Sequence, residues 1–175
     1  MADFGDDDSD SGDGECFALA DQALKAAGAK SAADFGAVTA DADYKWGTAV
    51  STLNDALPGD IIQFRNFKIV TTTTTVTTTT HADGSVDTQT STDMQTLGRP
   101  HHTAIIWSQS GSGVANVLEQ NVDPGGKVVQ NDQLNFSDST SSTSNVSQSG
   151  SDTTKTDTTV TIKVTGTKWI FRPTK

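Results

Sequence analysis

Four residues that are far apart in the sequence supply the groups of a nucleophilic site: Cys16, His102, Glu119 and Asn121. Cys16 is the only cysteine, and a thiol attacks carbonyl carbons once it has lost its proton. A histidine can take that proton, and a carboxylate or carboxamide beside the imidazole fixes its orientation. Together these residue types predict acyl transfer, in which a thiolate attacks an amide carbonyl and water then hydrolyses the acyl-enzyme.

The histidine and the carboxylate belong to a segment that predicts a β-hairpin. In HHTAIIWSQSGSGVANVLEQN, residues 101–121, two β-prone runs flank a Ser/Gly turn cluster. Alternate side chains of a strand share a face, so His102 shares one with Ala104, and Glu119 shares one with Asn121. The imidazole, the carboxylate and the carboxamide are therefore expected to converge at one end of the hairpin.

The cysteine belongs to a predicted helix. In ECFALADQALKAAGAK, residues 15–30, apolar residues recur at helical spacing and Gly28 provides a stop. Cys16 lies in the first turn, where the helix dipole and free backbone N–H groups stabilise a thiolate. The same N–H groups can form an oxyanion hole for a tetrahedral intermediate.

The remaining segments predict an α+β fold. Residues 48–57, TAVSTLNDAL, predict a short second helix that ends at the turn Pro58-Gly59-Asp60. Residues 61–70, IIQFRNFKIV, predict a strand, and the later runs KVVQ, TVTIKVTG and KWIFRP predict further strands. We expect one or two helices followed by five to seven antiparallel strands.

Two polar segments interrupt this pattern. Residues from about 68 to 97 contain two Thr-rich runs around an Asp-Gly turn, which predict a protruding hairpin exposed on both faces at the sheet edge. Residues from about 134 to 157 are rich in Ser, Thr and Asp, and predict either a loop or a second polar hairpin. The acidic segment 1–14 is expected to be a disordered tail, and 15–175 to be one domain carrying both insertions.

Composition excludes several classes of function. A net charge of −10 and a pI near 4.4 disfavour nucleic acid and anionic membrane surfaces as partners. A single cysteine excludes an internal disulfide and a Cys-based zinc site, and no cofactor is predicted. The sequence shows no apolar run long enough to span a membrane and no Sec-type signal peptide. We therefore expect a soluble protein that, if it is exported or delivered to another cell, uses another route.

Four short segments, taken in order, resemble the CHAP domain family within the NlpC/P60-like, papain-related cysteine hydrolases. They are GECFALADQAL, PGDIIQF, HTAII and LEQN, and the similarity covers roughly residues 14–66, 98–131 and the last strand. The resemblance implies a CHAP-type papain-like fold, in which the N-terminal helix that carries the cysteine packs on an antiparallel sheet.

The resemblance also implies a role for each site residue. Cys16 is the implied nucleophile, His102 the general base and later acid, and Glu119 the residue that orients the imidazole. Asn121 is the implied auxiliary polar residue near the ring. The preceding residue, His101, stands where the family more often has Gly; His102 is the predicted base because it directly precedes the T-A-I-I run.

For this family the implied substrate is the peptide part of peptidoglycan, cut by an amidase or an endopeptidase. Two alternatives remain open at the level of sequence. One is a catalytically inactive or adhesive module that uses its Thr-rich arms for assembly, with self-association through polar strand edges. The other is an acyltransferase or a protease that acts on unrelated proteins, since papain-like folds host all of these.

Overall fold

The computed structural model describes residues 15–39, 42–123 and 125–175. The acidic segment 1–14, which the sequence predicts to be disordered, lies outside the described residues. The chain divides into two compact units. Unit 1 comprises the described residues of Met1–Lys68, Gly98–Phe136 and Thr165–Lys175, and unit 2 comprises Ile69–Leu97 and Ser137–Val164.

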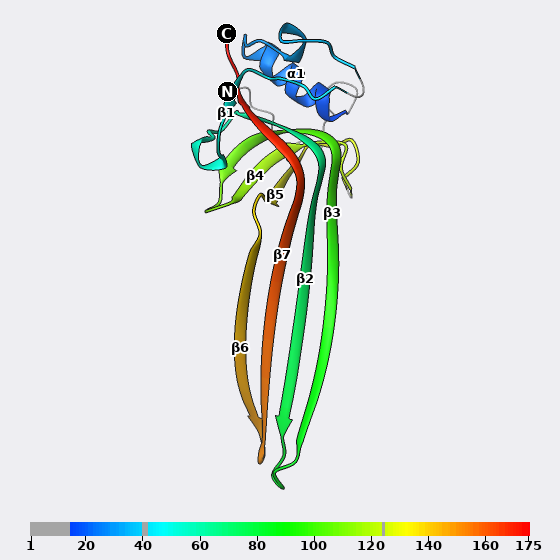
Figure 1. The fold of residues 1–175 in the computed structure, drawn as a ribbon, viewed down its shortest axis with the longest axis vertical. Helices are drawn as coiled ribbons and strands as arrows, with labels where there is room; N and C mark the ends of the chain where they lie inside the picture. The colour runs from blue at the N-terminus through cyan, green and yellow to red at the C-terminus, as the bar shows by residue number, and fades with distance from the viewer. Residues whose placement is uncertain (1–14, 40–41, 124) are drawn as a thin grey trace. The chain divides into compact units, whose positions relative to one another are not determined.

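Antiparallel strands make up most of the chain (Figure 1). The sheet has the order β1-β7-β2-β3-β4-β5, and β6 pairs with β7. The elements are α1 (Cys16–Ala26), β1 (Thr48–Val50), β2 (Ile61–Thr80), β3 (Val86–Gln109), β4 (Val114–Glu119), β5 (Gln130–Asn135), β6 (Ser139–Ser149) and β7 (Asp152–Arg172), with short 3-10 helices at Ala32–Asp34 and Leu53–Asp55.

The predicted α+β, CHAP-type fold class is wrong. The described residues form a mostly antiparallel β-sheet with a single α-helix, α1, of 11 residues. The expected second helix at 48–57 is absent: Thr48 and Val50 belong to β1, and only a 3-10 turn follows. Both are β-branched and suit a strand, and β1 pairs with the end of β7, where Thr48 lies opposite Arg172. None of the helices in the described part has the length and apolar character needed to cross a membrane.

The core of unit 1 is apolar and contains the inner face of α1. Ala20 and Leu24 form one buried cluster with Trp46, Ile61 and Phe171. Burying each large side chain of this kind contributes roughly 1.5–3 kcal/mol. This packing fixes the helix, and therefore its first residue, relative to the strands of unit 1.

β2 and β7 approach each other closely at one point in unit 1. Asn66 in β2 has a left-handed backbone, with φ of 51°, and Gly166 in β7 has φ of 87°. A Cβ on Gly166 would lie 2.1 Å from the carbonyl oxygen of Asn66. The site therefore requires glycine for its backbone conformation and for the space it leaves.

Unit 2 is a sheet without an apolar layer. Its strand segments follow the order β6-β7-β2-β3, side by side in Figure 1. All residues of unit 2 are described, and Ile69 is the only buried one. The β6–β7 hairpin shows that the Ser-rich segment, left open between loop and hairpin by its sequence, forms strands.

Hydroxyl and carboxylate contacts connect the strands of unit 2. Thr79 lies 3.3 Å from Thr154 between their hydroxyl oxygens, and Ser142 lies 3.0 Å from Thr159. At the turns, His81 contacts two carboxylates: Nδ1 lies 2.9 Å from Asp152 and Nε2 lies 3.0 Å from Asp87. Cross-strand pairs of this kind contribute roughly 0.2–1 kcal/mol each. The stability of unit 2 therefore depends on many weak side-chain contacts.

Candidate active site

Cys16 is the first residue of α1, as the sequence predicts. Its sulfur accepts hydrogen bonds from the backbone N–H groups of Phe17 and Thr103, and is hydrogen-bonded to the side chain of His102. Burial raises the pKa of the thiol, but the hydrogen bond and charge of His102, with the two N–H groups, outweigh burial and lower it. The site thus favours a thiolate paired with an imidazolium.

His102 lies on β3 and is buried, with its ring stacked at 6.2 Å on Phe64. Its Nε2 is 2.9 Å from Oε2 of Glu119, which leaves Nδ1 as the ring nitrogen available to the thiol. The Nε2 contact does not have the geometry of a hydrogen bond. The attraction between His102 and Glu119 is therefore mainly that of an ion pair. Burial lowers the pKa of His102, but its polar contacts and charge interactions with Cys16 and Glu119 raise it overall.

Glu119, the last residue of β4, is held by an arginine as well as by the histidine. Arg99 Nε donates to Oε2 at 2.9 Å and Nη2 donates to Oε1 at 2.5 Å, a bidentate pair. Arg99 is 4% exposed and Glu119 is 0% exposed. Burial raises the pKa of Glu119, but hydrogen bonds and charge from Arg99 and His102 lower it to about 2. Glu119 is therefore a fixed anion at any physiological pH.

Asp132 on β5 lies at the outer side of this ion pair, with its Oδ2 3.9 Å from Arg99 Nη2. Burial and the neighbouring Glu119 carboxylate raise the pKa of Asp132. Arg99 is nevertheless paired mainly with Glu119, because two of its nitrogens bond to that carboxylate, whereas Asp132 makes only the longer contact.

The two residues after Glu119 contact the residue before the nucleophile. Gln120, 0% exposed, donates from Nε2 to the carbonyl oxygen of Glu15 at 3.0 Å. Asn121 donates from Nδ2 to Oε2 of Glu15 at 2.6 Å, and its φ of 62° is left-handed. The left-handed turn ends the strand alternation that would have placed Asn121 beside Glu119. The structure thus brings Asn121 to Glu15, not to the imidazole.

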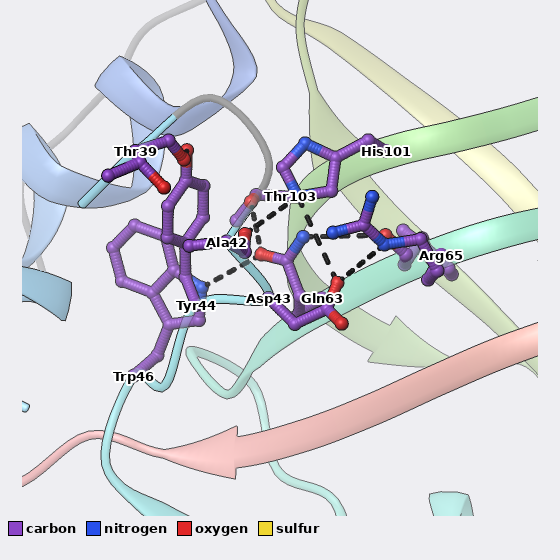
Figure 2. A network of polar contacts seen from close by, with 10 residues as sticks. Thr39, Ala42, Asp43, Tyr44, Trp46, Gln63, Arg65, His101 and Thr103 are labelled. Atoms are coloured by element: carbon purple, nitrogen blue, oxygen red, sulfur yellow. Dashed lines mark hydrogen bonds and ion pairs between the residues drawn. The ribbon is translucent and has the colours of Figure 1, made fainter. Parts of the chain in front are cut away.

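His101 points into a different network, drawn in Figure 2. Its Nε2 lies 2.8 Å from the carbonyl oxygen of Ala42, and its ring is 5.5 Å from that of Tyr44. Asp43, in the same network, accepts from Arg65 Nε at 2.7 Å. Of the two adjacent histidines, His102 is the one that the structure brings to Cys16 and Glu119.

A buried glutamine supports the strand that carries His102. Gln63 Oε1 accepts hydrogen bonds from Thr103 Oγ1 at 2.9 Å and from Trp46 Nε1 at 3.3 Å (Figure 2). The Phe17 ring lies 5.2 Å from Trp46 and 5.0 Å, edge to face, from Tyr44. Phe17 and Thr103, whose backbone N–H groups contact the Cys16 sulfur, are thereby fixed in position.

A hollow opens next to this aromatic group. Tyr44, which contacts Phe17, also belongs to its wall. The hollow is therefore one side chain away from Phe17, the residue that follows the nucleophile. It is lined by Ala32, Phe35, Gly36, Ala37, Asp43, Tyr44 and Lys45.

The sequence predicted three of the interacting residues, Cys16, His102 and Glu119, but not Arg99 or Gln120. Arg99 lies in a Gly-Arg-Pro tripeptide that suggests a solvated turn, and nothing in the sequence indicates a buried guanidinium. Gln120 had a weak signal, its position inside LEQN. Among the described residues, no group of three or more His, Cys, Asp or Glu side chains could hold a metal ion.

A thiol at a helix start, a buried imidazole and a buried carboxylate are the parts of a cysteine proteinase site. The family model described as AIM3/BBC1 Cysteine proteinase-fold domain matches residues 4–146. The chain belongs to this family. The match supports a papain-like cysteine proteinase fold in the broad sense and does not point to the CHAP family in particular. No curated protein matches the chain.

Proposed function

We propose that this protein is a cysteine hydrolase that cleaves amide or peptide bonds. The observation that carries the proposal is the contact of one buried histidine with the Cys16 sulfur on one side and the Glu119 carboxylate on the other. This arrangement holds a thiolate and an imidazolium next to each other before substrate arrives, which is what covalent acyl transfer requires.

In the reaction, the Cys16 sulfur forms a bond to the amide carbonyl carbon, and the carbonyl π electrons move to oxygen. The donor that we assign to that oxyanion is the backbone N–H of Cys16, because the N–H groups of Ala18 and Leu19 donate to the Glu15 carbonyl. His102 then gives its proton to the leaving nitrogen as the C–N bond breaks, which leaves a thioester. Water next loses a proton to His102 and attacks the thioester, releasing the acid and returning the proton to the imidazole–thiol pair.

The substrate class that we propose first is the peptide part of peptidoglycan, cut at an amide or peptide bond. Its support is the similarity of GECFALADQAL, HTAII and LEQN to motifs of peptidoglycan hydrolases. The alternative is a catalytically inactive module with a binding or assembly role, which the exposed polar sheet of unit 2 favours.

Thiol reactivity tests the catalytic centre directly. We expect iodoacetamide to label Cys16 at pH 6 faster than it labels an ordinary cysteine, because His102 and two backbone N–H groups lower the pKa of the thiol. His102→Ala should slow labelling, because it removes the side chain that contributes most to lowering the pKa of the thiol. The matched control is His101→Ala, which should label like the wild type. Equal, slow labelling in all three proteins would remove the nucleophile from the proposal.

Product analysis tests the substrate. Purified peptidoglycan is incubated with the wild type and with Cys16→Ala, and the soluble products are identified by mass spectrometry. New amino groups or muropeptides only with the wild type would support the proposal. If Cys16 is reactive but no such product forms, the proposed peptidoglycan substrate is wrong, while the proposed hydrolase activity still stands.

A further inference from the structure

The sheet of unit 2 has two outer strands within the described chain. In the order β6-β7-β2-β3, these are β6 and residues 86–97 of β3. An outer strand presents a row of backbone N–H and C=O groups that can pair with another strand. Proteins usually guard such an edge with charge, proline or a bulge, and the two edges differ in these features.

The β6 edge has none of these guards. Residues Ser139–Ser149 contain no Lys, Arg, Asp, Glu or Pro. Their pairing with β7 runs from Ser139 opposite Ile162 to Ser149 opposite Asp152 without a register shift, so no bulge bends the strand. Every residue of β6 is exposed, including Val146 at 65%. The whole strand is regular, uncharged and accessible.

The β3 edge carries charge. Asp87 and Asp93 lie in its outer part and both are exposed. Two such edges paired antiparallel would place carboxylates near carboxylates, and like charges across strands are destabilising. Pairing of this edge with itself is therefore disfavoured.

The charges next to β6 compensate one another. Lys155 on β7 pairs with Asp157 at 2.8 Å, and Lys163 pairs with Asp138 at 2.7 Å. A second copy of this acidic chain, with its net charge of −10, thus meets a locally neutral surface at β6. Of the two outer edges, β6 is the one that tolerates its own copy.

We propose that β6 pairs antiparallel with β6 of a second copy of this chain, which joins two unit 2 sheets into one. The pairing is two-fold symmetric and closed, so it ends at a dimer. Pairing of β6 with β3 of the next copy would instead leave an open edge at each end and grow into a filament. The interface is small and polar, and we expect a Kd of about 10–100 µM. This proposal does not depend on the hydrolase activity.

Sedimentation of the full chain tests the pairing. From about 1 µM to about 1 mM, a range that brackets the expected Kd, the wild type should change from monomer to dimer. Ser144→Lys places a charge in the middle of β6, opposite Asp157, which can receive it without loss of the fold. We expect this variant to raise the Kd at least tenfold. Thr90→Lys makes the same change on the β3 edge and should leave the Kd within twofold.

Disulfide trapping gives the geometry. In a Cys16→Ala background, Ser142→Cys, Thr143→Cys, Ser144→Cys, Asn145→Cys and Val146→Cys each place one thiol on the central part of β6. Two-fold antiparallel pairing brings one position directly opposite its own copy, so one variant of this consecutive set should cross-link to a dimer under mild oxidation. Thr90→Cys on β3 should not. A wild type that stays monomeric, growth beyond a dimer, or loss of the dimer in Thr90→Lys would overturn the proposal.

Discussion

Unit 1 and unit 2 stabilise polar groups in opposite ways. In unit 1, Arg99, His102 and Glu119 are buried charged or chargeable side chains, and the first two each lie within hydrogen-bond distance of the Glu119 carboxylate. In unit 2, hydroxyl groups lie on an open sheet where Ile69 alone is buried. The contacts of these three side chains in unit 1 are strong because burial excludes solvent from them. The contacts in unit 2 are weak because solvent competes for the exposed hydroxyl groups.

The difference teaches where a substitution should matter. A buried charge that loses its partner remains buried, and its desolvation is no longer offset. A surface threonine that loses its partner finds water instead. The same number of atoms removed should therefore have unequal consequences in the two units, and the following predictions test that inequality.

The largest effect is expected at Arg99. Arg99→Met leaves Glu119 buried without its bidentate partner, and we expect a loss of about 3–5 kcal/mol in the free energy of unfolding. The matched change in unit 2 is Lys155→Met, which breaks an exposed pair with Asp157 and should cost at most about 1 kcal/mol. Urea unfolding of both variants measures the two losses. Equal losses would show that burial does not separate the units.

A second comparison uses two glycines with positive φ. Gly166→Ala in unit 1 forces a Cβ against the Asn66 carbonyl, and we expect a loss of about 3 kcal/mol from strain and contact. Gly150→Ala in the β6–β7 turn has a φ of 62° but nothing within 4 Å of the new Cβ. Its loss should be only about 1 kcal/mol. Thermal unfolding of both variants should rank them in this order.

Two single groups, Glu119 in unit 1 and His81 in unit 2, should respond to pH in opposite directions. The pKa of Glu119 is about 2, against an ordinary 4.5, so its contribution is complete above pH 4.5 and is lost as pH falls to about 2. His81 has its pKa raised above 6.5, mainly by its hydrogen bonds to Asp87 and Asp152. Its contribution is present below pH 6.5 and is lost as pH rises through the raised pKa.

Amide hydrogen exchange, followed residue by residue, separates these two responses. Protection around Glu119 should fall in acid, and the variant Glu119→Gln should lose that acid dependence. Protection at the turns next to His81 should fall on the alkaline side, and His81→Gln should abolish the change. A common pH midpoint in both units would contradict the assignment.

The smallest effect is expected within the hydroxyl network. Ser142→Ala removes a 3.0 Å contact with Thr159, and we expect a change of about 0.5 kcal/mol or less. The control is Thr103→Val in unit 1, which removes a hydroxyl of similar size. It leaves Gln63 with one fewer buried donor and should cost roughly 1–3 kcal/mol. Chemical unfolding of the pair decides the comparison.

The sequence predicted the local elements of the site because those elements have local signals. Helical spacing located α1 and its first residue, Cys16, and strand alternation gave the shared face of His102 with Ala104. The second partner of Glu119, Arg99, could not be predicted from the sequence, because their contact depends on how β3 and β4 pair. The predicted position of Asn121 beside the imidazole was wrong for a related reason. The prediction assumed that strand alternation continues past Glu119, but the left-handed backbone of Asn121 ends it.

The fold class was harder because threonine and serine favour both strands and turns. The Gly-Arg-Pro tripeptide at residues 98–100 predicted the end of a hairpin, yet β3 continues through it from Val86 to Gln109. Pairing with neighbouring strands overrode the local turn preference. In the same way, Thr48 and Val50 joined the sheet in a segment for which a short helix was predicted.

The three consecutive residues 119–121 have a consequence for how the site is held. Glu119 contacts the histidine, Gln120 binds the carbonyl just before the cysteine, and Asn121 binds the carboxylate of Glu15. These three residues therefore link the orientation of the imidazole to the start of α1. The geometry of the base and the position of the nucleophile depend on the same short segment.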